Sequence, residues 1–156
     1  MKIRVLLAYG VSLLGFVASL LKPDSVWLVL PGAPFFVLLC ATIHEGGHCI
    51  GCLGKGNEIT EIGLPFLKIR KRKLITTSEM TSYCKFKKGK SDVFIYALGP
   101  VFSLIHAAIW LGVYMRIGNI VTFIYLTAST LVFLINMLPV RNNDLQKIIE
   151  ELELHN

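Results

Sequence analysis

The residues best suited to chemistry in this sequence lie together in one hydrophobic stretch. His44, Glu45 and His48 all fall within the apolar tract from Val26 to Leu53. A charge at the centre of a membrane helix costs about 2.5 to 3.5 kcal/mol on insertion scales, so ionisable groups there need a partner or a purpose. If the tract is helical, the two histidines lie one turn apart on the same face, and both imidazoles can point at one metal ion.

The carboxylate between the histidines extends this interpretation. His44-Glu45-Gly46-Gly47-His48 has the H-E-x-x-H pattern, in which two histidines bind zinc and the glutamate acts as general base. Glu45 can therefore reach a water at the metal rather than the metal itself. A chance match would leave these groups in a membrane helix with no evident ion-pair partner. The pattern predicts a zinc ion held by His44 and His48, with Glu45 as the catalytic residue.

The third metal ligand must come from elsewhere, because a catalytic zinc takes three protein ligands and keeps one position for water. Asp144, His106 and the cysteines are the candidates. Pro139 ends the last apolar tract and predicts a kink or unwound segment, and Asp144 follows five residues later. Irregular backbone at membrane depth is tolerated only inside protein or beside a watery cavity. Alternatively, Asp144 is a solvated residue that caps an amphipathic helix from Leu145 to Leu154.

Hydrophobic spans are the elements expected to position these groups. The chain has 156 residues, of which 54% are hydrophobic and 17% charged, a composition too apolar for a soluble domain. Four tracts approach the roughly 20 residues that cross a hydrocarbon core of about 30 Å. They run from Val5 to Leu21, Val26 to Leu53, Val93 to Met115 and Ile120 to Leu138. The expected fold is an all-α polytopic membrane protein with a single membrane domain, residues 1–156.

Two details of the first half of the chain need interpretation. The second tract is overlong, and Pro31 and Pro34 near its start predict that the regular helix begins at about Ala33. The first tract follows Lys2 and Arg4 and could be a signal peptide instead of a span. We favour a retained helix, because the apolar run exceeds an h-region of about 7 to 15 residues and no A-x-A pattern follows it.

The basic residues predict the orientation. Ten of them lie between positions 55 and 91, namely Lys55, Lys68, Arg70, Lys71, Arg72, Lys73, Lys85, Lys87, Lys88 and Lys90. This segment is therefore expected in the cytoplasm, together with both termini and the tail 140–156, most simply at a bacterial cytoplasmic membrane. The net charge of +6 fits anionic lipid headgroups of the bilayer. Few aromatic residues lie in the segment, so nucleic acid is not an expected partner.

The cysteines and the remaining buried histidine are expected to have structural roles. Cys49 and Cys52 form a C-x-x-C pair within the apolar tract, where such spacing beside glycines favours packing over a second metal site. Cys84 falls in the predicted cytoplasmic segment, where thiols stay reduced. His106 is expected to be hydrogen-bonded within the third span rather than to gate the site.

Three pieces of the chain resemble the site-2 protease family of intramembrane zinc metalloproteases. The segment from His44 to His48 stands in place of the family's HExxH within a span. Gly99-Pro100, at the entrance to the third span, is similar to the family's A-x-G-P-x-x-N. Asn136-x-x-Pro139 followed by Asp144 has the spacing of N-x-x-P-x-x-x-x-D. The order and spacing agree across roughly residues 35 to 145, although Leu145 replaces the glycine that usually follows the aspartate.

The resemblance implies a catalytic core and a substrate site. The core would consist of the second to fourth spans around one zinc ion per chain, bound by His44, His48 and Asp144, with Glu45 as general base. An extended element on the cytoplasmic side can pair with substrate in this family, and the tract from Ile59 to Ile75 could supply a short β-hairpin with a turn near Arg70 to Lys73. The expected substrate-binding residues are Asn136, Gly99, Pro100 and Ser103.

The function expected from this pattern is hydrolysis of peptide bonds in membrane-spanning proteins or peptide precursors. A catalytically silent scaffold or chaperone of the same fold is one alternative, and a zinc-binding transport or sensor module is another. Glu45 argues against the scaffold, because a metal-only site has no need of that carboxylate. A transporter would be expected to carry ionisable pairs in several spans, whereas Glu45 is the only carboxylate well within one. The sequence predicts no oligomeric state.

Overall fold

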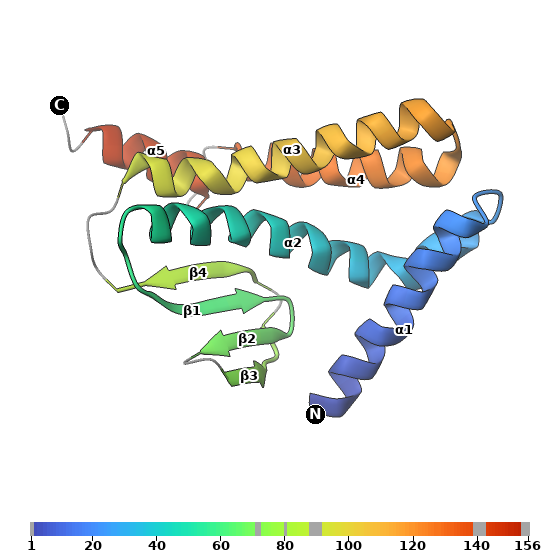
Figure 1. Cartoon of the computed structure of the whole chain (residues 1–156), viewed down its shortest axis with the longest axis horizontal. Coiled ribbons are helices and arrows are strands. Elements are labelled where there is room, and N and C mark those ends of the chain that lie inside the picture. The colour runs from blue at the N-terminus through green and yellow to red at the C-terminus, as the bar shows by residue number, and fades with distance from the viewer. Residues whose placement is uncertain (1, 71–72, 80, 88–91, 139–142, 154–156) are drawn as a thin grey trace.

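The computed structural model describes residues 2–70, 73–79, 81–87, 92–138 and 143–153. Within them the chain is mostly helical, with a four-stranded sheet inserted between the second and third long helices. Helix α2 (Val29–Gly54) lies in the middle of the molecule, with α3 (Val93–Ile117) and α4 (Ile120–Asn136) on one side and the sheet on the other (Figure 1). Helix α1 (Lys2–Leu21) runs obliquely past the start of α2, and α5 (Asp144–Glu153) lies beside the start of α3.

The predicted spans are helices close to the predicted positions. Helix α1, the short 3₁₀ helix η1 (Val26–Leu28) continued by α2, and α3 are long and apolar enough to cross a membrane. Helix α4 is apolar but has 17 residues, which gives about 26 Å at 1.5 Å per residue, against a hydrocarbon core of about 30 Å. Three spans are therefore supported by helix length and composition, and the fourth stays a prediction.

The predicted start of α2 is wrong. The helix begins at Val29 rather than at about Ala33, and Pro34 lies inside it. A proline within a helix removes one backbone donor and disturbs the preceding turn. Here the Phe35 N–H donates to the Ser12 hydroxyl of α1 at 2.8 Å. The neighbouring helix thus supplies an acceptor where the internal ladder is disturbed, and α2 continues through the proline.

The segment between α2 and α3 is more regular than the predicted hairpin. Four antiparallel strands, β1 (Ile59–Leu64), β2 (Leu67–Arg70), β3 (Lys73–Thr76) and β4 (Tyr83–Phe86), are arranged in the order β3-β2-β1-β4. The expected β-hairpin-like insertion in an otherwise helical chain is therefore larger than predicted, because the tract pairs over three strands and recruits a fourth. The predicted turn is consistent with the register, in which Arg70 pairs with Lys73. Residues 71 and 72 lie outside the described part of the chain.

The buried Glu61 carboxylate of β1 is paired by charged residues of the neighbouring strands and by one tyrosine. Glu61 on β1 lies opposite Arg70 on β2 and Lys85 on β4, and its carboxylate also lies 3.3 Å from the Lys68 ammonium. The Tyr83 hydroxyl donates to the same carboxylate at 2.8 Å. This hydrogen bond, followed by the nearby lysines, lowers the pKa of Glu61 against the opposing effect of burial. The opposite face of the sheet is turned towards α2 and carries Cys84.

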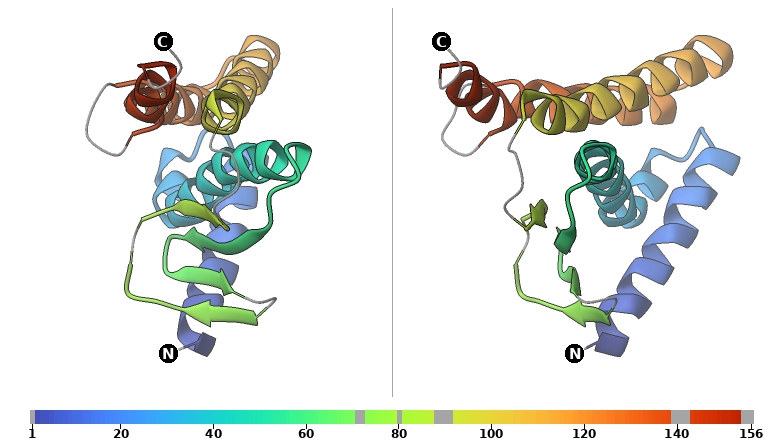
Figure 2. Two further views of the ribbon diagram at one scale, coloured as in Figure 1. Left: turned by 90° about the vertical axis from the view of Figure 1, so that its left-hand side faces the viewer. Right: turned by 60° about the vertical axis from the view of Figure 1, so that its left-hand side comes forward.

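An aromatic cluster holds the helices together at the N-terminal half of α2. The Phe36 ring lies 4.6 Å from the Tyr125 ring and 5.6 Å from the Trp110 ring, measured between centroids. Aromatic pairs of this kind contribute about 0.5 to 1.5 kcal/mol beyond their buried area. The Ser19 and Tyr125 hydroxyls hydrogen-bond at 2.8 Å and join α1 to α4. The packed core therefore takes its α2 residues from positions 29–40, ahead of the histidines. Figure 2 shows α2 between the sheet on one side and α3, α4 and α5 on the other.

Two adjacent glycines of α2 provide a test of this packing. A Cβ atom at Gly47 would lie 2.3 Å from the Leu98 carbonyl oxygen of α3, whereas a Cβ atom at Gly46 would meet nothing within 4 Å. We expect Gly47→Ala to destabilise the folded protein by about 1 to 3 kcal/mol, as overpacking does, and Gly46→Ala to leave it intact. Thermal unfolding of the two variants in detergent measures the difference. Equal melting temperatures would contradict the close approach of α2 and α3.

Candidate metal centre

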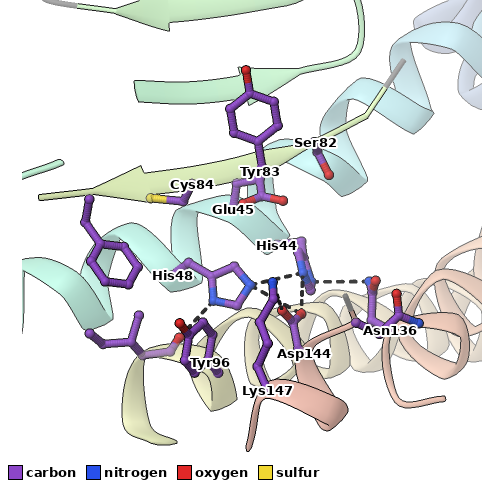
Figure 3. Close-up of a pocket in the computed structure, with 13 residues that line it drawn as sticks. His44, Glu45, His48, Ser82, Tyr83, Cys84, Tyr96, Asn136, Asp144 and Lys147 are labelled. Atoms are coloured by element: carbon purple, nitrogen blue, oxygen red, sulfur yellow. Dashed lines mark hydrogen bonds and ion pairs between the residues drawn. The ribbon is translucent and has the colours of Figure 1, made fainter. Parts of the chain in front are cut away.

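Three side chains from α2 and α5 converge on a single point. The Asp144 Oδ2 atom lies 2.9 Å from His44 Nε2 and 3.3 Å from His48 Nε2, and the two nitrogens are 3.3 Å apart (Figure 3). All three side chains are buried. A tetrahedral zinc ion with bonds of 2.0 to 2.1 Å separates its ligands by about 3.3 Å. The three atoms are therefore spaced like one face of a zinc coordination tetrahedron, and the group could hold a metal ion.

The outer nitrogens of both imidazoles are engaged in a way that orients the rings. His48 Nδ1 donates to the Ile95 carbonyl of α3 at 2.8 Å. Because a carbonyl can only accept, this bond places the proton on Nδ1 and leaves the Nε2 lone pair for a metal. His44 Nδ1 lies 2.9 Å from the Ser103 hydroxyl. Helix α3 thus fixes both rings while α2 supplies their spacing.

Asp144 is the first residue of α5 and is buried, so its interpretation as a solvated helix cap is wrong. Burial by itself would raise the pKa of Asp144, but its close contacts with His44 and His48 outweigh that effect and hold the pKa well below its usual range. Lys147, one turn along α5, places its ammonium 3.7 Å from the other carboxylate oxygen. The aspartate is therefore held as the anion that a divalent ion requires. Pro139, the predicted cause of the preceding break, lies outside the described residues.

Glu45 is buried beside this group but is not part of it. One carboxylate oxygen, Oε2, has no hydrogen-bond partner among the described residues, and Ser82, in the segment before β4, lines the same cavity (Figure 3). A buried polar atom without a partner costs about 1 to 3 kcal/mol and calls for an explanation such as a catalytic role or a bound ion or water. The position of Glu45 fits a group that handles a proton next to a metal.

A cavity of about 150 Å³ opens at the three ligands and Glu45. Its walls come from five elements or their flanks, since β4, α3, α4 and α5 all approach α2 there. Sequence reasoning missed several of these residues. Lys147 could have been predicted to lie at the site, because it follows Asp144 by one helical turn. The other missed lining residues are Ser82, Tyr83, Cys84, Phe86, Ile95, Tyr96 and Asn143.

The predicted substrate-binding residues all lie near the site, but their contacts are with the histidines. A Cβ atom at Gly99 would lie 2.3 Å from His48 Nε2, so the absent side chain leaves room for the ring. Pro100 is buried next to it in α3, and the buried Ser103 contacts His44 as described above. The Asn136 amide lies 3.4 Å from His44 Nδ1 and lines the cavity. Their roles in substrate binding stay predictions.

His106 and the C-x-x-C pair lie outside the ligand group. The Trp110 indole N–H donates to His106 Nε2 at 3.0 Å, which agrees with the expected hydrogen-bonded role. Among the described residues the metal-ligand group contains no cysteine. Cys52 is completely buried, and Cys49 lies 3.4 Å from Cys84, sulfur to sulfur.

The bond between His44 and Ser103 can be tested through metal affinity. Ser103→Ala removes the nearer of the two partners of His44 Nδ1 and leaves the Asn136 amide at 3.4 Å. Loss of such an outer partner typically lowers metal affinity about 10- to 100-fold. Ser129→Ala removes another buried hydroxyl, one that only donates to the Leu126 carbonyl, and is the matched control. Competition with a fluorescent zinc chelator measures both. Unchanged zinc affinity in Ser103→Ala would exclude the hydroxyl as an orienting group.

Comparison with family models, with curated proteins and with solved structures finds no match for this chain. Two structural properties of the described residues bear on the function. It has a buried His-His-Asp group that could hold a metal ion, and it has three helices long and apolar enough to cross a membrane. The function must be inferred from the chemistry of that group and its surroundings.

Proposed function

We propose that this protein is an intramembrane zinc metalloendopeptidase of the site-2 protease type. The observation that carries the proposal is Glu45, a buried carboxylate next to three convergent ligands. Its Oε2 atom has no hydrogen-bond partner in the part of the chain that the structure describes. Two imidazoles and one carboxylate are a donor set typical of catalytic zinc. A site that only stored or sensed the metal would have no use for a second carboxylate that is not a ligand. The sequence motifs support the same assignment.

Each residue of the site would have its own role in the reaction. His44, His48 and Asp144 would hold the ion, with their outer contacts keeping them in place. When bound, zinc supplies a Lewis acid that lowers the pKa of water towards 7 and polarises a peptide carbonyl. Glu45 would accept the proton of the attacking water and pass it to the leaving amine. Oε2 of Glu45, which has no hydrogen-bond partner among the described residues, would be the oxygen that accepts this proton.

The substrate would be a polypeptide in extended conformation. Strand β4 stands at one end of the sheet order and, with the residue before it, lines the cavity. An extended chain can add to such an edge through backbone hydrogen bonds, which would bring a peptide bond towards the metal. The partners are therefore membrane-spanning proteins or peptide precursors. The basic segment predicts that the cavity and both termini face the cytoplasm.

The experiment is cleavage of a panel of tagged single-span proteins and peptide precursors by the purified protein in detergent. Cleavage is expected to stop when a strong zinc chelator is added and to return when zinc is restored. The Glu45→Gln variant, which keeps the ligands, is expected to be inactive throughout. Fragments that form equally with the chelator, or equally with Glu45→Gln, would reject the assignment. Stoichiometric zinc binding with no cleavage of any panel member would favour the sensor or scaffold alternative.

A further inference from the structure

A pair of thiols lies beside the metal centre and has no part in the proposed mechanism. Cys49 follows Glu45 by one turn of α2, and Cys84 lies on β4. Their sulfur atoms are 3.4 Å apart. A disulfide bond is about 2.05 Å long, so the two sulfurs need to approach by only about 1.4 Å, the difference between these two lengths. The pair joins two elements that are 35 residues apart in sequence.

Exposure separates this pair from the other two cysteines. Cys40 and Cys52 are 4% and 0% exposed, whereas Cys49 and Cys84 are only partly buried. Cys84 also lines the cavity at the metal centre. Reactive thiols are those that are accessible to their reagent. The pair therefore combines proximity with access, which the other two thiols lack.

We propose that Cys49 and Cys84 are a reversible redox pair that controls the shape of the metal cavity. The oxidant is a low-molecular-weight disulfide of the glutathione type. One cysteine attacks it and forms a mixed disulfide, releasing the first small thiol. The second cysteine then attacks the mixed disulfide, which forms the Cys49–Cys84 bond and releases the second small thiol. Two protein thiols and one small disulfide give one protein disulfide and two small thiols, so electrons and protons balance.

The consequence for the cavity follows from what β4 carries. Ser82 and Tyr83, the two residues before Cys84, line the metal cavity together with Glu45. Drawing Cys84 onto α2 moves this strand towards the helix and shifts the groups that surround the glutamate. A misplacement of about 1 Å at a reacting group can lower a rate by up to about 100-fold. Oxidation therefore slows peptide cleavage, and this part of the inference rests on the proposed function.

The bond itself is tested on the full chain purified in detergent. Wild type and Cys52→Ser are treated with oxidised glutathione, and intact mass and disulfide mapping are recorded. Both are expected to lose two hydrogens and to yield a cross-linked peptide joining Cys49 and Cys84. Cys49→Ser is expected to yield none and to keep a free thiol or a glutathione adduct. Wild-type protein that gains only glutathione adducts, or that links either residue to Cys52, overturns the pair.

The effect on the cavity is tested by a separate measurement on the same samples. Oxidised wild type is expected to cleave a panel substrate about 10- to 100-fold more slowly than reduced wild type, and dithiothreitol should restore the rate. The double variant Cys49→Ser/Cys84→Ser, which can form neither the disulfide nor an adduct at either position, should cleave at one rate with and without oxidant. A mapped disulfide with unchanged cleavage overturns control of the cavity. If no form cleaves any substrate, the proposed function fails, while the mapping still decides whether the redox pair exists.

Discussion

Glu45→Gln is expected to lower peptide cleavage at least about 100-fold, because a positioned general base contributes about 100- to 10,000-fold. Glutamine keeps the size of the side chain but cannot accept a proton. The three ligands are untouched, so zinc content should stay at one ion per chain. Cleavage of a tagged substrate and elemental analysis of the same preparation measure the two properties together.

The matched control for this variant is Glu58→Gln, which makes the same chemical change in the segment between α2 and β1. It is expected to cleave at the wild-type rate. Two outcomes would contradict the assignment of Glu45. Full activity of Glu45→Gln would remove it from the mechanism. Loss of zinc from Glu45→Gln would make the carboxylate a ligand rather than a base.

Asp144→Ala is expected to produce the largest loss of metal. The variant removes the only carboxylate of the ligand group and leaves two histidines on one helix. Its effect should exceed the roughly 10- to 100-fold weakening that follows loss of an outer-shell partner, because a bond to the ion itself is lost. Zinc retained after dialysis against a competing chelator measures it, and cleavage should disappear in parallel.

Asp24→Ala is the control for this second variant, since Asp24 is exposed in the turn between α1 and η1. It should retain zinc and activity. The prediction for Asp144 is wrong if the variant still holds one zinc ion with wild-type affinity. In that case the close contact of the carboxylate with both imidazoles would be an ion pair that only stabilises α5.

The sequence predicted the part of the site that depends on helical periodicity. His44 and His48 share a face of α2 because they are four residues apart, and the structure confirms that they converge. Asp144 could not be chosen from its position alone, since a cap and a ligand have the same local sequence. Only the spacing shared with a known family favoured the ligand, and only the burial of Asp144 against both imidazoles separates the two interpretations.

Residues that reach the site through contacts between distant parts of the chain could not be predicted from the sequence. The Ile95 carbonyl orients His48, but a backbone group leaves no signal in the sequence. Ser82 and Cys84 reach the cavity because β4 pairs with β1 across an intervening hairpin, a pairing that alternation within one tract does not reveal. The start of α2 was misplaced for a similar reason, because the acceptor that stabilises the helix at Pro34 is Ser12 of another helix.

The position of Asp144 at the first residue of α5 has a thermodynamic consequence. A bound ion would act as a reversible cross-link between positions 44 and 144, and so between the second helix and the last. Occupancy of the ion and attachment of the C-terminal helix would then be one coupled equilibrium, in which each raises the population of the other by mass action. Removal of the ion should first raise the rate of backbone hydrogen exchange in α5, before exchange changes in the helices α1 to α4.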